Sequence, residues 1–361
     1  MKLARIERLG LNGPEPRVVA VDLARGVVVD VARAGQSRLE RAGHTPAAAR
    51  RIADAHLPQS VAAGLGSACY REDLEQAIDS DPPDDAILAL DQVKWLAPVD
   101  PPRFRDFMTF EQHHLSARHV LERPVPDVTY TLPTYYKAGH LSLFAHEQTI
   151  PWPGYCEWMD YELELGFVVG GGGTDLTPDE ASGCLFGVTL LNDFTSRDRQ
   201  FAETAGNLGP AKGKDFGTAL GPWIVTVDEL ELTDIDLSAH VNGSTWAQGN
   251  SGSAMWSAAE VLAYLSTCEP LVPGELIGSG TIGGGCGLEV GRRLIPGDTV
   301  ELRSSVLGAL RNELGEPAAL RWSPPARTPG RTIDGRGGVH LTELLPPRAD
   351  APAPPFPRSG P

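Results

Sequence analysis

Along the first 33 positions of the chain, apolar runs of strand length, notably residues 17–22 and 26–31, alternate with turn residues. Short apolar runs bounded by turn residues predict β-strands. Helical patterns follow around residues 46–56 and 71–78, before an acidic, proline-bearing stretch at 79–85 that indicates an exposed loop. The prolines clustered in residues 98–102 resist both a helix and a central strand. We therefore predict a small N-terminal β-rich domain over residues 1–98.

The second part of the chain, residues 99–345, shows mostly short strand patterns with helical patterns at 110–121, 197–204 and 257–266. Residues 160–169 alternate acidic and apolar side chains and then run apolar into glycines, which predicts a strand that ends in a turn. Residues 184–191 form another apolar run, so that Asp193 is expected at a strand end. The proline-rich tail, residues 346–361, is expected to be disordered or to lie along the surface.

The composition narrows the class of protein. The 361 residues allow one large domain and a smaller one, and 40 glycines and 31 prolines favour a β-rich fold with many turns. A net charge of −16 argues against nucleic acid or an anionic membrane as the main partner. No apolar stretch approaches the roughly 20 residues of a membrane-spanning helix, and no signal-peptide pattern is seen. The five cysteines form no Cys-x-x-Cys pair, as expected of a reduced, cytoplasmic protein.

Glu162 and Glu164 carry the clearest chemical signal. Residues i and i+2 of a strand face the same side, so both carboxylates are expected to point into one space, with Asp193 close by. Carboxylates that converge repel one another unless a cation lies between them. Oxygen ligands suit Mg²⁺, Mn²⁺ or Ca²⁺ rather than zinc. A solvated strand face is the alternative, but the flanking residues are too apolar for it.

Other candidate residues lie in three further segments. Asp106 is expected where a helix begins, and His113, about two turns later, is a candidate general base. The alternative is that Asp106 only caps the helix and that His113 is partly buried in it. Arg197 and Gln200 share one helix face, with Asp193 or Thr195 as the expected cap.

Arg197 and Gln200 could hold a carboxylate or an oxyanion, although an ordinary surface helix with an Arg199–Asp198 pair is the alternative. Lys214 adds a positive charge in the glycine-rich segment 208–223. Its glycine spacing is not that of a phosphate-binding loop, and residues 278–285 likewise do not fit a nucleotide fingerprint.

Taken together, these motifs resemble the fumarylacetoacetate hydrolase family, and most closely its long, fumarylacetoacetase-like branch. The resemblance covers about residues 103–345 and is strongest in Asp160-Tyr161-Glu162-Leu163-Glu164, Asn192-Asp193-Phe194-Thr195-Ser196-Arg197-Asp198, Gly213-Lys214-Asp215-Phe216-Gly217-Thr218 and Gly280-Thr281-Ile282. It implies a β-rich α+β fold in which a mixed β-sandwich roll follows a small SH3-like β-barrel domain.

The resemblance also implies a role for each candidate residue. Asp106, Glu162, Glu164 and Asp193 would ligate Mg²⁺, or alternatively Ca²⁺ or Mn²⁺. His113 would be the base, with Glu289 as its partner because Ser116 occupies the position of the glutamate that shorter members use. The remaining roles would be an oxyanion and substrate-carboxylate site (Arg197, Gln200, Lys214), substrate contacts (Tyr136, Thr281) and positioning of the loop beside the metal (Thr218). Met108 and Thr204 occupy substrate-contacting positions where fumarylacetoacetase-like members have tyrosines, which argues against fumarylacetoacetate itself as the substrate.

The implied activity is a metal-dependent hydrolase that cleaves a C–C bond in a small 1,3-diketo acid, such as an acylpyruvate or a fumarylacetoacetate-like acid. His113 would act as general base, and a Mg²⁺-bound enolate would be the intermediate. Two alternatives remain open: a lyase or isomerase of the same family (a 2-oxo acid decarboxylase, hydratase or sugar-acid dehydratase), and a non-catalytic member that binds metal and small diacids. The resemblance further implies a homodimer.

Overall fold

The computed structural model describes residues 1–10 and 13–325, so the prediction for the tail at 346–361 lies outside the described residues. All of the elements below belong to one unit, Met1–Leu320. The strands are β1 (Lys2–Gly10), β2 (Gly13–Asp22), β3 (Val27–Asp30), β4 (Ile87–Ala89), β5 (Lys94–Leu96), β6 (Phe104–Phe107), β7 (Tyr135–Ala138), β8 (Leu143–Phe144), β9 (Ile150–Trp152), β10 (Met159–Asp160), β11 (Leu163–Val169), β12 (Leu185–Asp193), β13 (Thr195–Ser196), β14 (Thr218–Thr226), β15 (Asp236–Val241), β16 (Ser244–Asn250), β17 (Leu276–Gly278), β18 (Thr299–Ser304) and β19 (Gly308–Pro317).

The helices include several short ones. The α-helices are α1 (Val31–Arg41), α2 (Pro46–His56), α3 (Val61–Leu65), α4 (Tyr70–Ile78), α5 (Glu111–Val120), α6 (Pro178–Ser182), α7 (Arg197–Ala205), α8 (Ala258–Ser266) and α9 (Gly287–Val290). The 3₁₀ helices are η1 (Asp84–Ala86), η2 (Leu90–Gln92), η3 (Asp127–Tyr130), η4 (Val227–Glu229) and η5 (Ser251–Ser253).

A large mixed sheet forms the backbone of the fold. Its strand order is β4-β3-β2-β1-β14-β12-β11-β17-β6-β7, with β5 added beside β1 and β8 beside β14. Every residue of β11, β12 and β14 is buried, because both faces of these central strands are covered. The N-terminal strands are continuous with the others, since β1 pairs with β14 in the register Leu3 to Ile224. Strands β12, β11, β17 and β6 are neighbours in this order, so side chains on them can lie close together.

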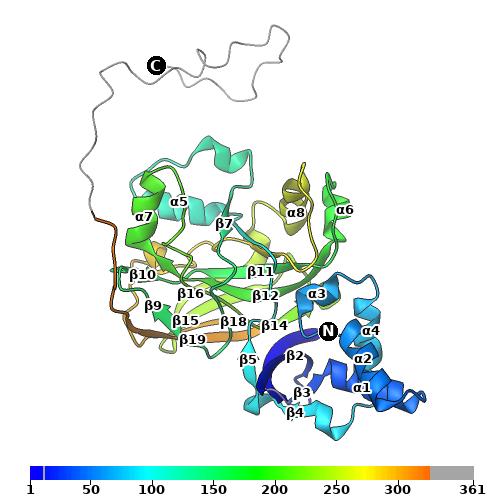
Figure 1. The fold of residues 1–361 in the computed structure, drawn as a ribbon. Helices are drawn as coiled ribbons and strands as arrows, with labels where there is room; N and C mark the ends of the chain where they lie inside the picture. The colour runs from blue at the N-terminus through cyan, green and yellow to red at the C-terminus, as the bar shows by residue number, and fades with distance from the viewer. Residues whose placement is uncertain (11–12, 326–361) are drawn as a thin grey trace, which may run out of the picture. The chain divides into compact units, whose positions relative to one another are not determined.

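A second sheet, of order β16-β15-β18-β19-β9, packs on the first through contacts of β18 and β19 with β12 and of β19 with β14. Leucines and valines of both sheets, for example Val188, Leu190, Val300 and Leu310, belong to one buried apolar cluster. Figure 1 shows α5 and α7 on the same side of strands β10–β12, with α1–α4 beside the N-terminal strands. This arrangement confirms the predicted mixed, β-rich α+β class. An SH3-like form of the first strands and a boundary between residues 98 and 99 stay predictions.

Local sequence signals explain several helix boundaries. Helix α2 covers Pro46–His56 as predicted, because Thr45 accepts a hydrogen bond from the N–H of Ala48 and Pro46 suits the first helical turn. Helix α8 begins after Ser257, which forms a reciprocal capping box with Glu260. The sequence pattern did not reveal α1, which follows β3 directly and is capped by Asp30.

Two predicted boundaries are wrong. Asp106 does not begin a helix but lies in β6, between β17 and β7. The polar sequence of β6 is compatible with a buried strand because Arg105 forms ion pairs with Glu275 and Glu269. Neither Asp193 nor Thr195 caps α7: its N-cap residue is Ser196, and in the described part of the chain no side chain forms the capping hydrogen bond.

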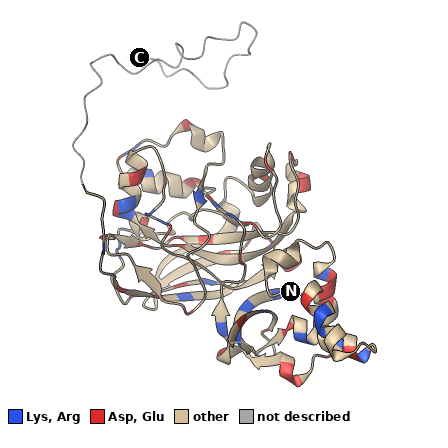
Figure 2. Cartoon of the chain, viewed as in Figure 1, with Lys and Arg blue, Asp and Glu red and all other residues tan. Residues whose placement is uncertain are grey.

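Charged residues of both signs lie next to each other on the helices of the N-terminal part (Figure 2), so the net charge of −16 is not gathered into one block there. Within residues 1–10 and 13–325, no helix has the length and apolar character needed to cross a membrane.

Candidate active site

A cavity of about 500 Å³ opens beside α5 and α7 and receives side chains from both sheet strands and loops. It contains nearly all of the residues singled out in the sequence. Those that line it are Asp106, Met108, His113, Tyr136, Glu162, Glu164, Arg197, Gln200, Thr204, Lys214 and Thr281. The predicted Asp193 and Glu289 do not line it directly but contact residues that do.

Three buried carboxylates form a compact group beside this cavity. Asp106 on β6, Glu164 on β11 and Asp193 at the end of β12 each offer an oxygen, and these oxygens all lie within 4.8 Å of one another. Burial, followed by the neighbouring charge of Asp193, raises the pKa of Asp106 well above its usual range. Burial and the charge of Asp106 raise the pKa of Glu164 in the same way. For both acids, burial and the mutual repulsion of the carboxylates therefore outweigh the charge of Lys214, which acts in the opposite direction.

The carboxylate group fits a divalent cation. Asp106 Oδ1 is buried and, among the described residues, accepts no hydrogen bond. A buried carboxylate oxygen without a donor is costly unless a cation binds it. Three carboxylates and no nitrogen or sulfur ligand form the donor set that Mg²⁺, Ca²⁺ or Mn²⁺ prefers.

Neighbouring hydroxyl and N–H groups fix two of these carboxylates. Glu164 accepts hydrogen bonds from the backbone N–H of Gly280 and the hydroxyl of Thr281, both at 3.2 Å. Asp193 accepts the hydroxyl of Tyr136 at 2.7 Å and that of Thr218 at 3.2 Å. Asp193 Oδ2 also accepts from Lys214. Second partners of this kind orient metal ligands in proteins.

Glu162 is held differently from the other three acids. It lies just before β11 and accepts hydrogen bonds from Arg197, at 2.7 Å, and from Lys214, which also donates to Asp193. Burial alone would raise the pKa of Glu162, but the charges of Lys214 and Arg197 outweigh it and lower the pKa to about 2. Glu162 is thus an ionised carboxylate paired with two cations, and its predicted role as a metal ligand stays a prediction.

Asp160 is a site residue to which the sequence reasoning assigned no role. Its carboxylate accepts the Nε–H of Arg197 at 2.8 Å and the backbone N–H groups of Gly287 and Leu288 at the start of α9. Arg197 also donates to Gln200 at 3.1 Å. Asp160 therefore joins Arg197 to the short helix that carries Glu289. Its position two residues before Glu162, on the same side of an extended chain, was the available signal.

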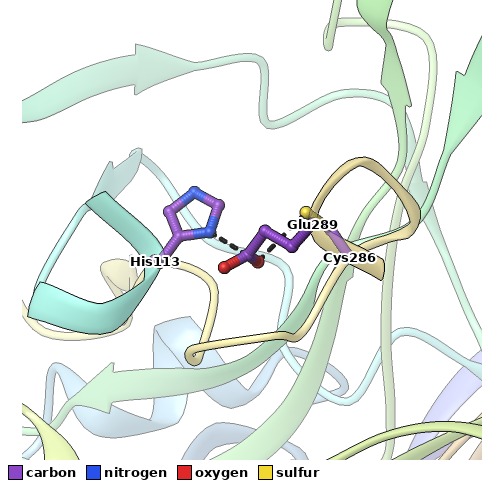
Figure 3. A group of neighbouring side chains, drawn as sticks. All are labelled: His113, Cys286 and Glu289. Carbon is purple, nitrogen blue, oxygen red and sulfur yellow. Dashed lines mark hydrogen bonds and ion pairs between the residues drawn. The ribbon is translucent and has the colours of Figure 1, made fainter. Parts of the chain in front are cut away.

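His113 and Glu289 meet as predicted. Nδ1 of His113 lies 2.9 Å from Oε2 of Glu289, across 176 residues of sequence (Figure 3). His113 comes from α5 and Glu289 from α9, and these two helices are in contact. Cys286 Sγ donates to the same glutamate oxygen at 3.2 Å, and burial raises the pKa of that thiol well above its usual range.

The outer part of the cavity carries a second pair of cations. Arg118 and Arg123 line it, and among the described residues neither guanidinium has an ion pair or a side-chain hydrogen bond. Met108 and Thr204 line the same cavity, and Met108 is 38% exposed. Neither arginine was predicted from the sequence as a site residue. Arg118 follows His113 in α5, and Arg123 lies just after the helix.

Comparison with known proteins gives both sequence and structural matches. A model of the Fumarylacetoacetate (FAA) hydrolase C-terminal family matches residues 104–315. An uncharacterized protein of Staphylococcus aureus (strain USA300) is 29% identical over 263 residues, which cover 70% of this chain and 85% of that protein. A protein of Staphylococcus aureus (strain NCTC 8325 / PS 47), also uncharacterized, matches to the same extent.

Solved structures share the fold at low sequence identity. A fumarylacetoacetate hydrolase from psychrophilic Exiguobacterium antarcticum superposes with a TM-score of 0.65 at 22% identity, covering 87% of this chain and 99% of that one. The 2-hydroxyhepta-2,4-diene-1,7-dioate isomerase from Mycobacterium marinum gives 0.58 at 20% identity, with 87% and 98% covered. The maleylpyruvate hydrolase from Sphingobium.sp SYK-6 gives 0.61 at 19% identity, with 87% and 99% covered.

Proposed function

The chain belongs to the fumarylacetoacetate hydrolase family, and on that premise we propose that it is a divalent-metal-dependent hydrolase that cleaves a C–C bond in a small 1,3-diketo acid. The observation that carries the proposal is the His113–Glu289 pair, which lies beside the same cavity as the group of Asp106, Glu164 and Asp193. A base beside a cation-binding group of acids is the arrangement that water activation next to a polarised carbonyl requires.

Asp106, Glu164 and Asp193 would hold the cation, Mg²⁺ in our proposal with Ca²⁺ or Mn²⁺ as alternatives, and when bound it would polarise the substrate carbonyl. His113 supplies the base. Because its Nδ1 faces the carboxylate of Glu289, the neutral ring keeps its proton on Nδ1 and presents an unprotonated Nε2. Nε2 then takes a proton from water, and the hydroxide attacks a carbonyl carbon of the substrate.

Lys214, Arg197 and Gln200 provide the donors for the oxyanion that forms at the attacked carbon. All three line the cavity, and Lys214 and Arg197 are buried cations. Preorganised donors of this kind stabilise the charge that develops in the transition state. The C–C bond then breaks, the attacked carbon leaves as a carboxylic acid, and protonated His113 returns its proton to the carbon of the departing fragment.

Arg118 and Arg123, which have no ion-pair partner within residues 1–10 and 13–325, favour a substrate with a second anionic end. A dicarboxylate would place one carboxylate near the buried cations and the other near these two arginines, because guanidinium groups bind carboxylates with two parallel hydrogen bonds. Two of the structural relatives, by their names, act on maleylpyruvate and on a heptadiene-1,7-dioate.

An isomerase is the second candidate. The structural relatives include isomerases, and a His113–Glu289 base could also move a proton between two carbons without adding water. Both candidates use the same residues, so the products decide between them.

The experiment is turnover of a panel of acylpyruvates, fumarylacetoacetate and oxaloacetate with Mg²⁺, followed by diketone absorbance and product chromatography. Two carboxylic acids whose formation stops with chelator and in His113→Ala would support the hydrolase. An isomerised diacid, or release of carbon dioxide, would overturn it in favour of an isomerase or a decarboxylase. We also propose that the enzyme is a homodimer, which sedimentation analysis tests.

A further inference from the structure

Cys286 lies beside the base but is not part of the proposed chemistry. Its side chain is fully buried, and Figure 3 shows the thiol and His113 on the carboxylate of Glu289. The sulfur lies 3.2 Å from Oε2, the oxygen that also faces Nδ1 of His113. A thiol at this distance from a carboxylate acts as a donor, since the carboxylate can only accept.

The carboxylate of Glu289 is fixed at both oxygens. Oε1 accepts the backbone N–H of Gly284 at 3.0 Å, while Oε2 accepts from His113 and from Cys286. The Glu289 side chain is only 1% exposed, so water does not substitute for a missing donor there. Removing the thiol donor leaves one donor on each oxygen, the N–H of Gly284 on Oε1 and His113 on Oε2.

The backbone of Cys286 connects the base to the cationic side of the cavity. Cys286 forms an antiparallel bridge with Glu162, the partner of Arg197 and Lys214. It also directly precedes α9, which carries Glu289. A single residue therefore ties the position of Glu289 to the strand end that holds Glu162.

We propose that Cys286 is a positioning residue, whose S–H donates to Glu289 and thereby holds that carboxylate in the orientation that aligns His113. The inference rests on the proposed role of His113 as the base. The competing explanation is that Cys286 only fills space as a small apolar residue, as buried cysteines often do. The two explanations differ in what a serine in its place does, because serine keeps a donor and changes the packing.

Kinetics of Cys286→Ala and Cys286→Ser separate these explanations. We expect Cys286→Ala to lower kcat about tenfold with KM changed less than about twofold, since a hydrogen bond to a charged group is lost but no group that contacts substrate is removed. Cys286→Ser should recover most of kcat. Cys184→Ala is the matched control, because Cys184 is also buried but its thiol donates to the helix carbonyl of Glu180, and it should leave kcat unchanged.

A double-mutant cycle adds a second readout. If Cys286 acts through Glu289, the effect of Cys286→Ala should disappear in a Glu289→Met background. Equal losses for the serine and alanine variants, or an alanine effect that persists in the Glu289→Met background, would overturn the proposal.

Infrared spectroscopy tests the hydrogen bond without any turnover. Subtracting the spectrum of Cys286→Ser from that of the wild type isolates the S–H stretching band of Cys286, and this band should move to higher frequency in Glu289→Met. A band that does not move would overturn the proposal even if His113 is the base. Conversely, a band that moves while His113→Ala keeps full turnover would support the hydrogen bond and refute the proposed function.

Discussion

Gly278 offers a test of the metal site that changes no charge. Gly278 on β17 pairs with Asp106 on β6, and a Cβ added to it would lie 2.1 Å from Asp106 Oδ1. The backbone of Gly278 is not in the left-handed region, so alanine fits the strand itself. The effect of Gly278→Ala is therefore confined to the collision with the Asp106 carboxylate.

The distance that the Asp106 carboxylate must move sets the expected loss of metal affinity. Real contacts of Cβ are essentially never under 3.0 Å, so the carboxylate must move by about 0.9 Å. Metal–ligand distances tolerate only about 0.2 Å, so Asp106 cannot keep its place as a ligand. We expect the dissociation constant for Mg²⁺ or Mn²⁺ to rise about 10- to 100-fold. Overpacking of this kind costs about 1–3 kcal/mol of folding free energy, which a protein of this size should tolerate.

Isothermal titration calorimetry with Mn²⁺ measures the dissociation constant, and circular dichroism confirms the fold. Gly183→Ala is the matched control, because Gly183 follows α6 with φ of −69° and its added Cβ would meet only a carbonyl oxygen at 3.4 Å. The control should bind Mn²⁺ like the wild type. Wild-type affinity in a folded Gly278→Ala variant would refute Asp106 as a ligand.

Three further predictions concern charge and protonation. With chelator present, Asp106→Asn should have a higher Tm than the wild type, because a buried carboxylate with an unpaired oxygen is removed. Added Mg²⁺ should raise the Tm of the wild type only, and an equal rise in both proteins would contradict the metal site. His113→Ala and Glu289→Gln should each lower kcat about 10²- to 10⁴-fold in steady-state assays, and the double variant little further, whereas additive losses would separate the two residues. Burial lowers the pKa of His146, whose Nδ1 accepts the N–H of Arg311. The contribution of neutral His146 to the free energy of unfolding should therefore be fully present above about pH 6.5 and fall by up to about 1.4 kcal/mol per pH unit below it. Chemical denaturation of the wild type should show this slope, and His146→Gln should reduce it.

The sequence carried most of the information about the acidic side of the cavity. Glu164 and Asp193 lie at the ends of strands whose apolar runs are unmistakable, and the structure brings both to one point. The pairing of His113 with Glu289 could be named only through the family resemblance, because 176 residues separate them and neither local pattern refers to the other. The contact is confirmed, whereas the catalytic roles stay predictions.

Long-range partners account for what the sequence did not reveal. The sequence pattern predicts the start of a helix at Asp106, yet Asp106 lies in strand β6, where the neighbouring Arg105 is neutralised by Glu275, the residue just before β17. Asp160 gained its role from the N-terminus of α9, which is 127 residues away. Such pairings depend on tertiary structure that overrides local preference.

The pairing of β1 with β14 has a consequence for the order in which the chain folds. The hairpin of β1 and β2 is local and can form as soon as those residues leave the ribosome. On the other edge of β1, Arg5–Glu7 pair with β5, but Lys2 and Leu3 pair with residues more than 200 positions later. Contacts of such high sequence separation form slowly, because a long loop must close first. Until β14 arrives, the Lys2–Leu3 end of β1 exposes an unpaired strand edge of the kind that promotes aggregation. We therefore expect the yield of folded enzyme to depend on slow synthesis or on chaperones that shield this edge.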